Sequence, residues 1–539
     1  MRGACTLDKI CIKSVRSLKD TGLVSLSPIT LLLGENSSGK STFLRAFPLL
    51  KQSISKRTDG PLLWAGDVDD YVDFGSFKET VTNDGKSDAI EFQFLFHLRN
   101  KNKYMRLSPK LRRTIRDKGS EAEKISYTIS IRQKGNHEYV SNLKVCINET
   151  IFEFDLSPVR WFGVAKVNGE TILKINTREQ FRQSILGIGF SRISSEVFGF
   201  SLPPIGNIIS ERLINPLFPE TAHGEERPHM LYSYQSQLID MIQLMGECLC
   251  KNMELEKIQE RFRDVFQEEI LDKLNSLIDM LKCEDEELPY KYGLFKLVYF
   301  YDRFWEIDNY LNTYFRQVHY IAPLRATAER YYRLRNLSIS EVDYQGKNLA
   351  IFLSGLTSTR LLDFQRWTQE YFGFKVRVQK SGGHLSIRIA LKNSRKSFNL
   401  SDTGFGYSQI LPIITQLWDL STRENPGSRE DVPLVIAIEQ PELHLHPALQ
   451  AKLTGAFIAA LPLAEQNGKR LQLILETHSE TIVNYLGNAI ATGDIDKEDV
   501  SVVLFDKAPE TNLTNVRISS YGADGLLENW PIGFFAPKE

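Results

Sequence analysis

The sequence has no long apolar run, few cysteines and almost no net charge, and each absence excludes a class of protein. No segment of about 18 or more consecutive apolar residues occurs, so we expect no transmembrane helix. The N-terminal residues contain no apolar signal-peptide core. The six cysteines show neither CxxC spacing nor the density of a disulfide scaffold. We therefore expect a cytoplasmic protein that makes no membrane contact.

Charge and composition set further limits. A formal net charge of −1 gives no overall attraction to nucleic acid, so nucleic-acid binding would require a local basic patch. With 42% hydrophobic and 25% charged residues, the composition is that of an ordinary globular protein. A chain of 539 residues predicts two or three domains of about 100–200 residues each. No internal repeat is visible, so the fold class must be inferred from motifs.

A glycine-rich sequence near the N-terminus carries the strongest motif. Gly34-Glu-Asn-Ser-Ser-Gly-Lys-Ser-Thr42 follows an apolar run and precedes a helix-like segment, which is the context of a phosphate-binding loop. Lys40 would reach the β- and γ-phosphates, and Ser41 would bind magnesium. The alternative, a chance glycine-rich turn, does not explain the full motif. The residues expected to contact the nucleotide here are Gly34, Asn36, Ser38, Gly39, Lys40, Ser41 and Thr42.

Two apolar segments near the C-terminal end each finish in ionisable residues. Residues 432–442 read as a buried strand that ends in Glu439-Gln440-Pro441-Glu442, and a carboxylate in this position can hold magnesium opposite a phosphate loop. Residues 471–480 read as a second buried strand, after which His478 could reach a γ-phosphate. We therefore predict that Ser41 and Glu439 bind magnesium and that Glu439, Gln440, Glu442 and His478 form the catalytic group.

Together these motifs resemble the ATP-binding-cassette ATPases of the SMC, RecF and OLD branch. In that family an N-terminal Walker A loop and a C-terminal signature, Walker B strand and switch histidine form one split head, which implies an α/β fold with mixed β-sheets. The resemblance covers roughly residues 6–90 and 320–535. The ending Trp530-Pro-Ile-Gly-Phe-Phe535 is similar to that of the prokaryotic subset containing Septu-type antiphage ATPases. The resemblance implies a homodimer that encloses ATP and Mg²⁺ between two heads.

The glycine-rich residues 399–412, here called the signature segment, are the candidate for the family's signature. A glycine-flanked serine at a helix N-terminus can donate N–H and hydroxyl bonds to a γ-phosphate. The spacing departs from the family's LSGGQ, so a simple helix-capping turn is the alternative, and either Ser401 or Ser408 could be the acting serine. The segment's candidate nucleotide contacts are Ser401, Gly404, Gly406, Ser408 and Gln409.

One departure from the family affects catalysis. Family members usually carry Asp-Glu where this chain carries Glu439-Gln440, and a glutamine amide can orient a water but cannot accept its proton. Glu442 or Glu476 could substitute, while His478 could hold the γ-phosphate and the nucleophile. We therefore predict slow hydrolysis and a long-lived ATP-bound dimer. The alternative is that Glu442 restores ordinary turnover.

Several other residues have two readings. His444 and His446, with Glu442, could bind a metal, but we favour their placement in a loop that packs across the head dimer. Arg325 could face the nucleotide or nucleic acid, or could form a structural ion pair. Gln52 is a weak candidate for a glutamine loop.

The middle of the chain is predicted to form two added regions. Short strand-like runs between residues 89 and 175 predict a β subdomain, and residues 180–315 predict a compact helical insertion for subunit or partner contacts. Residues 99–118 form the densest basic stretch, which could contact a nucleic-acid backbone or could be a solvated loop. The predicted domains are an ATPase lobe at 1–90, the β subdomain at 91–179, the insertion at 180–315 and a second ATPase lobe at 316–539.

The resemblance also bears on function. Too few residues follow Asp506 for the TOPRIM nuclease of OLD-type proteins, so we expect the effector to be a separate protein. Resemblance to Septu-type ATPases implies a sensor or regulator of antiphage defence that controls an HNH-type nuclease. A retron reverse transcriptase with its RNA–DNA hybrid completes some such assemblies. The alternative is a RecF-like DNA-repair ATPase stimulated by DNA, whereas a transporter motor is disfavoured by the helical insertion.

Overall fold

The structure is a computed structural model. It describes residues 7–56, 58–66, 70–98, 122–158, 163–176, 195–198, 200–202, 212–213, 217, 227–263, 265–266, 268–283, 285–334, 339–391, 396–423 and 432–529. The chain forms two compact units, each assembled from segments that are distant in sequence. The first unit comprises residues 1–11, 56–63 and 86–312, and the second comprises residues 12–55, 64–85 and 313–539. The basic stretch 99–118 and the residues from Trp530 onward lie outside the described part of the chain.

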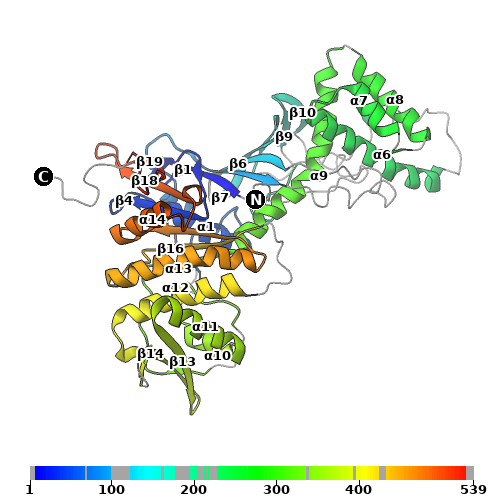
Figure 1. Cartoon of the computed structure of the whole chain (residues 1–539). Coiled ribbons are helices and arrows are strands. Elements are labelled where there is room, and N and C mark those ends of the chain that lie inside the picture. Colours follow the sequence, from blue (N-terminus) through cyan, green and yellow to red (C-terminus); the bar gives the residue numbers. More distant parts are fainter. Residues whose placement is uncertain are drawn as a thin grey trace. The chain divides into compact units, whose positions relative to one another are not determined.

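The first unit contains an antiparallel sheet followed by helices (Figure 1). The sheet order is β10-β9-β8-β7-β6-β5, and β5 pairs in turn with β1 (Leu7–Val15), whose residues up to Cys11 belong to this unit. The strands are β5 (Ala89–Leu98), β6 (Glu123–Lys134), β7 (His137–Ile147), β8 (Thr150–Leu156), β9 (Gly163–Val167) and β10 (Glu170–Ile175). Burial alternates residue by residue along β5, as its sequence predicts.

Among the residues that the structure describes, four helices follow these strands in the first unit. They are α6 (Arg227–Cys250), α7 (Leu255–Arg263), α8 (Glu268–Lys282) and α9 (Leu288–Arg316), of which α9 belongs to this unit up to Asn312. Aromatic side chains join the helices to the sheet, because the Phe300 ring of α9 stacks on Phe152 and Phe154 of β8 at centroid distances of 4.6 and 5.1 Å. Helices α6, α7 and α8 confirm the helical pattern predicted from Tyr232 to about Leu281.

The second unit is built on a six-stranded sheet with the order β11-β16-β17-β4-β18-β19. All neighbours are parallel except β18 and β19. The strands are β11 (Val318–Ile321), β16 (Leu434–Glu439), β17 (Leu471–Glu476), β4 (Ile29–Gly34), β18 (Val500–Lys507) and β19 (Thr514–Ser519). Every residue of β4, β16 and β17 is buried, which is typical of parallel strands covered on both faces. The predicted α/β fold with mixed sheets is confirmed.

Helices cover this sheet. α1 (Lys40–Ser55) packs against β4, β11, β16 and β17, and α13 (Pro447–Gln466) packs against β17 and against α12 (Phe405–Thr422) and α14 (Glu480–Thr492). Among the described residues, α13 is long and apolar enough to cross a membrane by length and composition alone. Leu453, Phe457 and Ala460 of α13 are nevertheless buried, so this side of the helix forms part of the core of the second unit.

A smaller sheet lies beyond α12 in Figure 1, and the sequence analysis did not anticipate it. It has the order β12-β14-β13, with β15 also paired to β14. Its strands are β12 (Tyr332–Arg333), β13 (Phe374–Ser381), β14 (His384–Leu391) and β15 (Ser397–Asn399), and its helices are α10 (Leu349–Gly355) and α11 (Ser358–Phe372). The remaining short elements are β2 (Leu18–Asp20), β3 (Val24–Ser25) and α2 (Phe77–Thr80), with 3₁₀ turns at Leu400–Asp402 and Lys497–Asp499.

Candidate functional site

The phosphate-binding loop joins β4 to α1, and its two glycines are required by the backbone. A Cβ atom at Gly34 would lie 2.3 Å from the carbonyl oxygen of Phe505 on β18, which no side chain can tolerate. Gly39 has a φ of +99°, a conformation that residues with a side chain rarely adopt. The loop therefore turns tightly enough to direct its N–H groups and the N-terminus of α1 toward an anion.

Lys40 folds back over this loop. Its Nζ donates hydrogen bonds to the carbonyl oxygens of Gly34 at 3.0 Å and Glu35 at 2.7 Å. Burial lowers the pKa of Lys40, and the nearby carboxylates of Glu476 and Glu442 oppose that shift. The buried hydroxyl of Ser38 has no hydrogen-bond partner among the described residues. An ammonium group and an unsatisfied hydroxyl at one glycine loop fit the binding of a phosphate.

Two buried glutamates end adjacent strands beside the loop. Glu439 is the last residue of β16 and Glu476 the last of β17, and the two are register partners. Both side chains belong to residues that are only 2% exposed. Because β17 lies between β16 and β4, Glu476 ends the strand that directly neighbours the strand of the loop.

Glu439 is fully occupied by protein donors. Arg45 of α1 donates from Nε to Oε1 at 2.7 Å and from Nη2 to Oε2 at 2.8 Å, and the hydroxyl of Tyr320 on β11 donates to Oε1 at 2.7 Å. The bonds to Glu439 raise the pKa of Arg45. Arg325, which is 5% exposed, donates from Nη2 to the backbone oxygens of Glu439 and Gln440 at 3.0 and 3.1 Å. The expected structural role of Arg325 is therefore seen, with backbone oxygens in place of an ion pair.

Glu476 has a different environment. The hydroxyl of Ser41 donates to its Oε1 at 2.8 Å, while Oε2 is buried without a hydrogen-bond partner among the described residues. Burial, with a further contribution from the charge of Glu439, raises the pKa of Glu476 to about 7. The predicted magnesium ligands Ser41 and Glu439 are thus not hydrogen-bonded to each other, because Ser41 faces Glu476.

Glu442 and His478 are linked through the backbone. The hydroxyl of Thr477 donates to Glu442 Oε2 at 2.8 Å, and the N–H of His478 donates to Oε1 at 2.8 Å. Burial raises the pKa of Glu442, and burial followed by the charge of Lys40 lowers the pKa of the His478 imidazole. Glu442 therefore holds the segment that carries His478. To act as a base it would first have to release one of these bonds.

The two candidate serines of the signature segment have different environments. Ser408 is buried on α12 and donates to the carbonyl oxygen of Phe405 at 2.7 Å, whereas Ser401 is exposed and donates to Asn399 Oδ1 at 3.0 Å. Gly404 is the N-cap of α12 and provides no side-chain cap. Ser401 is therefore the more accessible of the two candidates. Gln409 is buried and contacts the carbonyl oxygen of Arg325 at 3.5 Å.

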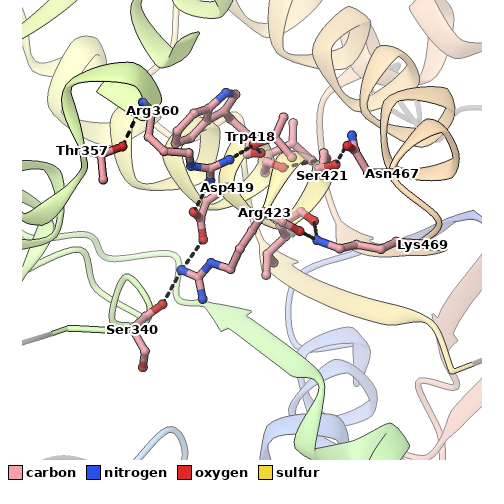
Figure 2. Close-up of polar contacts among 12 residues, drawn as sticks. Ser340, Thr357, Arg360, Trp418, Asp419, Ser421, Arg423, Asn467 and Lys469 are labelled. Atoms are coloured by element: carbon pink, nitrogen blue, oxygen red, sulfur yellow. Dashed lines mark hydrogen bonds and ion pairs between the residues drawn. The ribbon is translucent and has the colours of Figure 1, made fainter. Parts of the chain in front are cut away.

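The opposite end of α12 is fixed by a cluster of charged side chains, which Figure 2 shows. The Arg360 guanidinium lies 4.3 Å above the Trp418 ring and donates to Asp419 Oδ1 at 2.8 Å. Arg423 pairs with the second oxygen of Asp419, and Lys469 Nζ donates to the carbonyl oxygen of Leu420 at 3.2 Å. Cations near the C-terminus of a helix satisfy its last carbonyls. The signature segment thus starts a helix that is anchored at its far end.

The two histidines after β16 pack around the start of α12. His446 is the N-cap of α13 and accepts a bond from the N–H of Ala448 at 3.2 Å, and the His444 ring meets the Phe405 ring edge-on at 5.0 Å. They line a cavity of about 360 Å³ together with Gly404, Tyr407 and Lys452. No group of three metal-binding side chains occurs among the described residues, and Glu442 is bonded elsewhere.

Sequence reasoning missed Arg45 and Tyr320 as partners of Glu439. Arg45 follows Ser41 by four residues and so lies on the same helix face, a spacing that could have identified it. Tyr320 is brought in by the pairing of β11 with β16, for which the sequence holds no local signal. Gln52, the weak glutamine-loop candidate, is buried, and its amide exchanges bonds with the backbone of Val72 at 3.0 and 3.1 Å. Gln52 is therefore structural.

Comparison with protein families finds a match over more than half of the chain. The family described as "AAA ATPase domain" matches residues 6–157 and 254–483. A curated relative, Endonuclease GajA from Bacillus cereus (strain HuB5-5), is 33% identical over 84 residues, which make up 15% of this chain and 12% of that protein. The chain thus matches only a small part of that relative's length.

Two solved structures show similarity over most of the chain. The SMC head domain from Thermotoga maritima has a TM-score of 0.31 and 10% identity, and the recombination mediator RecF with a bound ATP analogue has a TM-score of 0.28 and 12% identity. In both cases 95% of this chain and 98% of the other chain are covered. TM-scores of this size support no inference about function.

Proposed function

Because the chain belongs to the AAA ATPase domain family, we propose that it is an ATP-binding regulator that hydrolyses ATP slowly and controls a separate nuclease. The observation that carries the proposal is the phosphate loop with Lys40 and Ser41 directly beside the buried Glu439 and Glu476. An unsatisfied Ser38 hydroxyl, an unsatisfied Glu476 oxygen and glycines that no Cβ could replace fit a nucleotide with magnesium.

Each residue of the site has a defined task in this proposal. Loop N–H groups and Lys40 bind the phosphates, Ser41 contributes to the magnesium site, and bound Mg²⁺ neutralises the developing charge on the phosphoryl oxygens. Gln440 follows Glu439, and its amide can orient a water without taking its proton. Glu442 is held by Thr477 and by the His478 backbone, so proton transfer to it would require the release of one of these hydrogen bonds. These features support slow turnover.

Dimer formation on ATP is part of the proposal. Gly404 starts α12, and the exposed Ser401 donates its N–H and hydroxyl to Asn399 Oδ1, bonds that a nucleotide bound by a second copy would replace. The anchored far end of α12 would keep those donors in place, because Arg360 and Arg423 both hold Asp419. ATP would then act as a clamp that favours the closed dimer.

The nuclease partner and the defence role are proposed from two similarities. The local similarity to an endonuclease supports an association with nuclease chemistry, and the resemblance to Septu-type ATPases supports antiphage defence with an HNH-type effector. Purification of the native complex would test this. A co-purifying nuclease, with or without a reverse transcriptase and its RNA–DNA hybrid, is the expected result. A chain that never brings down a nuclease or nucleic acid contradicts it.

Hydrolysis provides the direct test of the ATPase proposal. We expect single-turnover and steady-state assays to show tight ATP binding, little turnover and a dimer mass with ATP bound. Lys40→Ala is the control, and its affinity for ATP should be roughly thirtyfold or more below that of the native chain. Turnover at several per second without a partner would contradict slow hydrolysis, and strong stimulation by DNA would favour a RecF-like repair ATPase.

A further inference from the structure

The two carboxylates at the end of the central strands are chemically unequal. Glu439 and Glu476 are register partners, equally buried and close enough that the charge of one raises the pKa of the other. Three donors from Arg45 and Tyr320 occupy both oxygens of Glu439 at 2.7 to 2.8 Å. A carboxylate bound in this way on both oxygens has its charge already compensated.

Glu476 lacks such compensation. Among the described residues, the Ser41 hydroxyl donates to its Oε1, and its Oε2 has no hydrogen-bond partner. A buried carboxylate oxygen without a partner is costly, so its presence indicates a group that binds there. The Ser41 hydroxyl is one of the ligands that a phosphate loop offers to magnesium, and it already contacts Glu476.

We propose that Glu476, and not Glu439, is the carboxylate that holds the magnesium of bound ATP together with Ser41. Glu439 is then a positioning residue, which fixes Arg45 of α1 and Tyr320 of β11 beside the loop. The strand order supports this division, because β17 lies next to β4 while β16 is one strand farther away. The inference rests on the proposed ATP binding. It specifies which carboxylate makes the affinity for ATP depend on magnesium.

The test compares matched variants of the full chain. Affinity for a fluorescent ATP analogue is measured with Mg²⁺ and with excess EDTA, and Mn²⁺ binding in the presence of ATP is followed by electron paramagnetic resonance. Glu476→Gln should lose the gain in affinity that Mg²⁺ provides, by about tenfold or more, and should broaden or remove the bound Mn²⁺ signal. Its affinity in EDTA should match that of the native chain.

Glu439→Gln should retain the magnesium-dependent gain. Because it leaves Arg45 without its partner and can destabilise the fold, Tyr320→Phe serves as the milder variant of the same site, removing one donor only. Glu498→Gln, an exposed glutamate in the turn before β18, is the matched control for the loss of one negative charge. It should leave both affinities unchanged.

The outcomes separate this inference from the proposed function. Native chain that binds no nucleotide would contradict both. Nucleotide binding whose magnesium dependence survives in Glu476→Gln and is lost in Glu439→Gln or Tyr320→Phe would overturn the assignment and leave ATP binding intact. Equal losses in Glu476→Gln and Glu439→Gln would also overturn it, since the two carboxylates would then share the metal.

Discussion

Each unit of the molecule contains a trio in which an arginine and a tyrosine donate hydrogen bonds to a buried glutamate, and the two trios differ in their surroundings. In the first unit Arg303 donates from Nε and Nη2 to Glu123 Oε2 at 2.9 and 2.7 Å, and Tyr299 donates to Oε1 at 3.1 Å. Glu306 pairs with the remaining side of Arg303. In the second unit Arg45, Glu439 and Tyr320 repeat this arrangement.

The difference is the neighbour of each trio. The trio of the first unit lies between β6 and α9, and its cation is paired on two sides. The trio of the second unit adjoins Glu476, a carboxylate with one oxygen unsatisfied among the described residues. A buried carboxylate with all its partners stabilises the fold, whereas the open oxygen of Glu476 is the feature on which the proposed magnesium site depends. The same three residue types can therefore be purely structural or can support a site.

The largest effect that we expect in a test of this comparison is a loss of ATP affinity at the phosphate-binding loop. Lys40→Ala removes the ammonium group that caps the loop carbonyls and would meet the phosphates. We expect ATP affinity to fall by about 2–5 kcal/mol, which is roughly thirtyfold or more. Equilibrium binding of a fluorescent ATP analogue measures the loss. Affinity within about threefold of the native value would show that the loop does not bind phosphate.

The next effect concerns the first unit alone. Arg303→Met leaves Glu123 as a buried charge without its cation, so we expect a loss of about 3–5 kcal/mol in the free energy of unfolding. ATP affinity should not change. Denaturant unfolding and ATP binding are measured together, and the double variant Arg303→Met with Glu123→Leu should recover most of the stability. A loss of ATP affinity without loss of stability would contradict a structural role.

A smaller, pH-dependent effect is expected from Asp240 on α6. Burial, followed by the charge of Asp302, raises its pKa to about 7 from an ordinary value of 3.8. The folded protein therefore holds a proton that the unfolded chain releases, and stability is fully present below about pH 4 and is lost as the pH rises through 7. The loss is at most about 3 kcal/mol, because residual exposure screens the charge.

Asp240→Asn should remove this part of the pH dependence. The free energy of unfolding of the variant should exceed that of the native chain at pH 8 and should fall less between pH 5 and 8. Chemical denaturation at both pH values provides the measurement, and the buried Asp308, whose pKa is raised to about 6, accounts for a remaining slope. An unchanged slope in the variant would contradict the assignment.

The smallest effect is expected at the anchored end of α12. Arg360→Met removes a bond to Asp419 and the stacking of the guanidinium on Trp418 at a partly exposed site. We expect a loss of about 1–2 kcal/mol in stability, with the Glu476-dependent response to Mg²⁺ unchanged. Thermal unfolding with and without Mg²⁺ and ATP checks both. A changed Mg²⁺ response would mean that α12 acts on the metal site itself.

The local part of the fold could be predicted from the sequence. The glycine loop, the buried strands ending at Glu439 and Glu476, and the alternating strand from Ala89 all depend on short-range patterns and appear in the structure. The pairing of β17 with β4 could not be predicted, because its register joins residues more than four hundred positions apart, such as Ile29 and Leu473. The small sheet around β14 was missed for a different reason: β13 and β14 form a local hairpin that turns between Ser381 and His384, and this short-range signal was overlooked.

The residues of the candidate site could also be predicted only in part. Ser41 and Lys40 follow from the motif, but the choice of carboxylate depends on which strand is inserted beside β4. Sequence order makes Glu439 the natural partner, since it ends the first strand with a carboxylate after the signature segment. The donors that neutralise Glu439 come from α1 and β11, and only their spatial convergence shows that Glu476 is the carboxylate left open.

The position of β4 between β17 and β18 has a consequence for biosynthesis. A ribosome that has produced residues 1–430 has made the phosphate loop but neither strand that borders it. Until β18 emerges, the Phe505 carbonyl that closes over Gly34 is absent, and the apolar strand of the loop has open edges. The strand of the phosphate loop therefore gains its second neighbour only after residues 500–507 have been synthesised, so the loop is made early in synthesis and enclosed late.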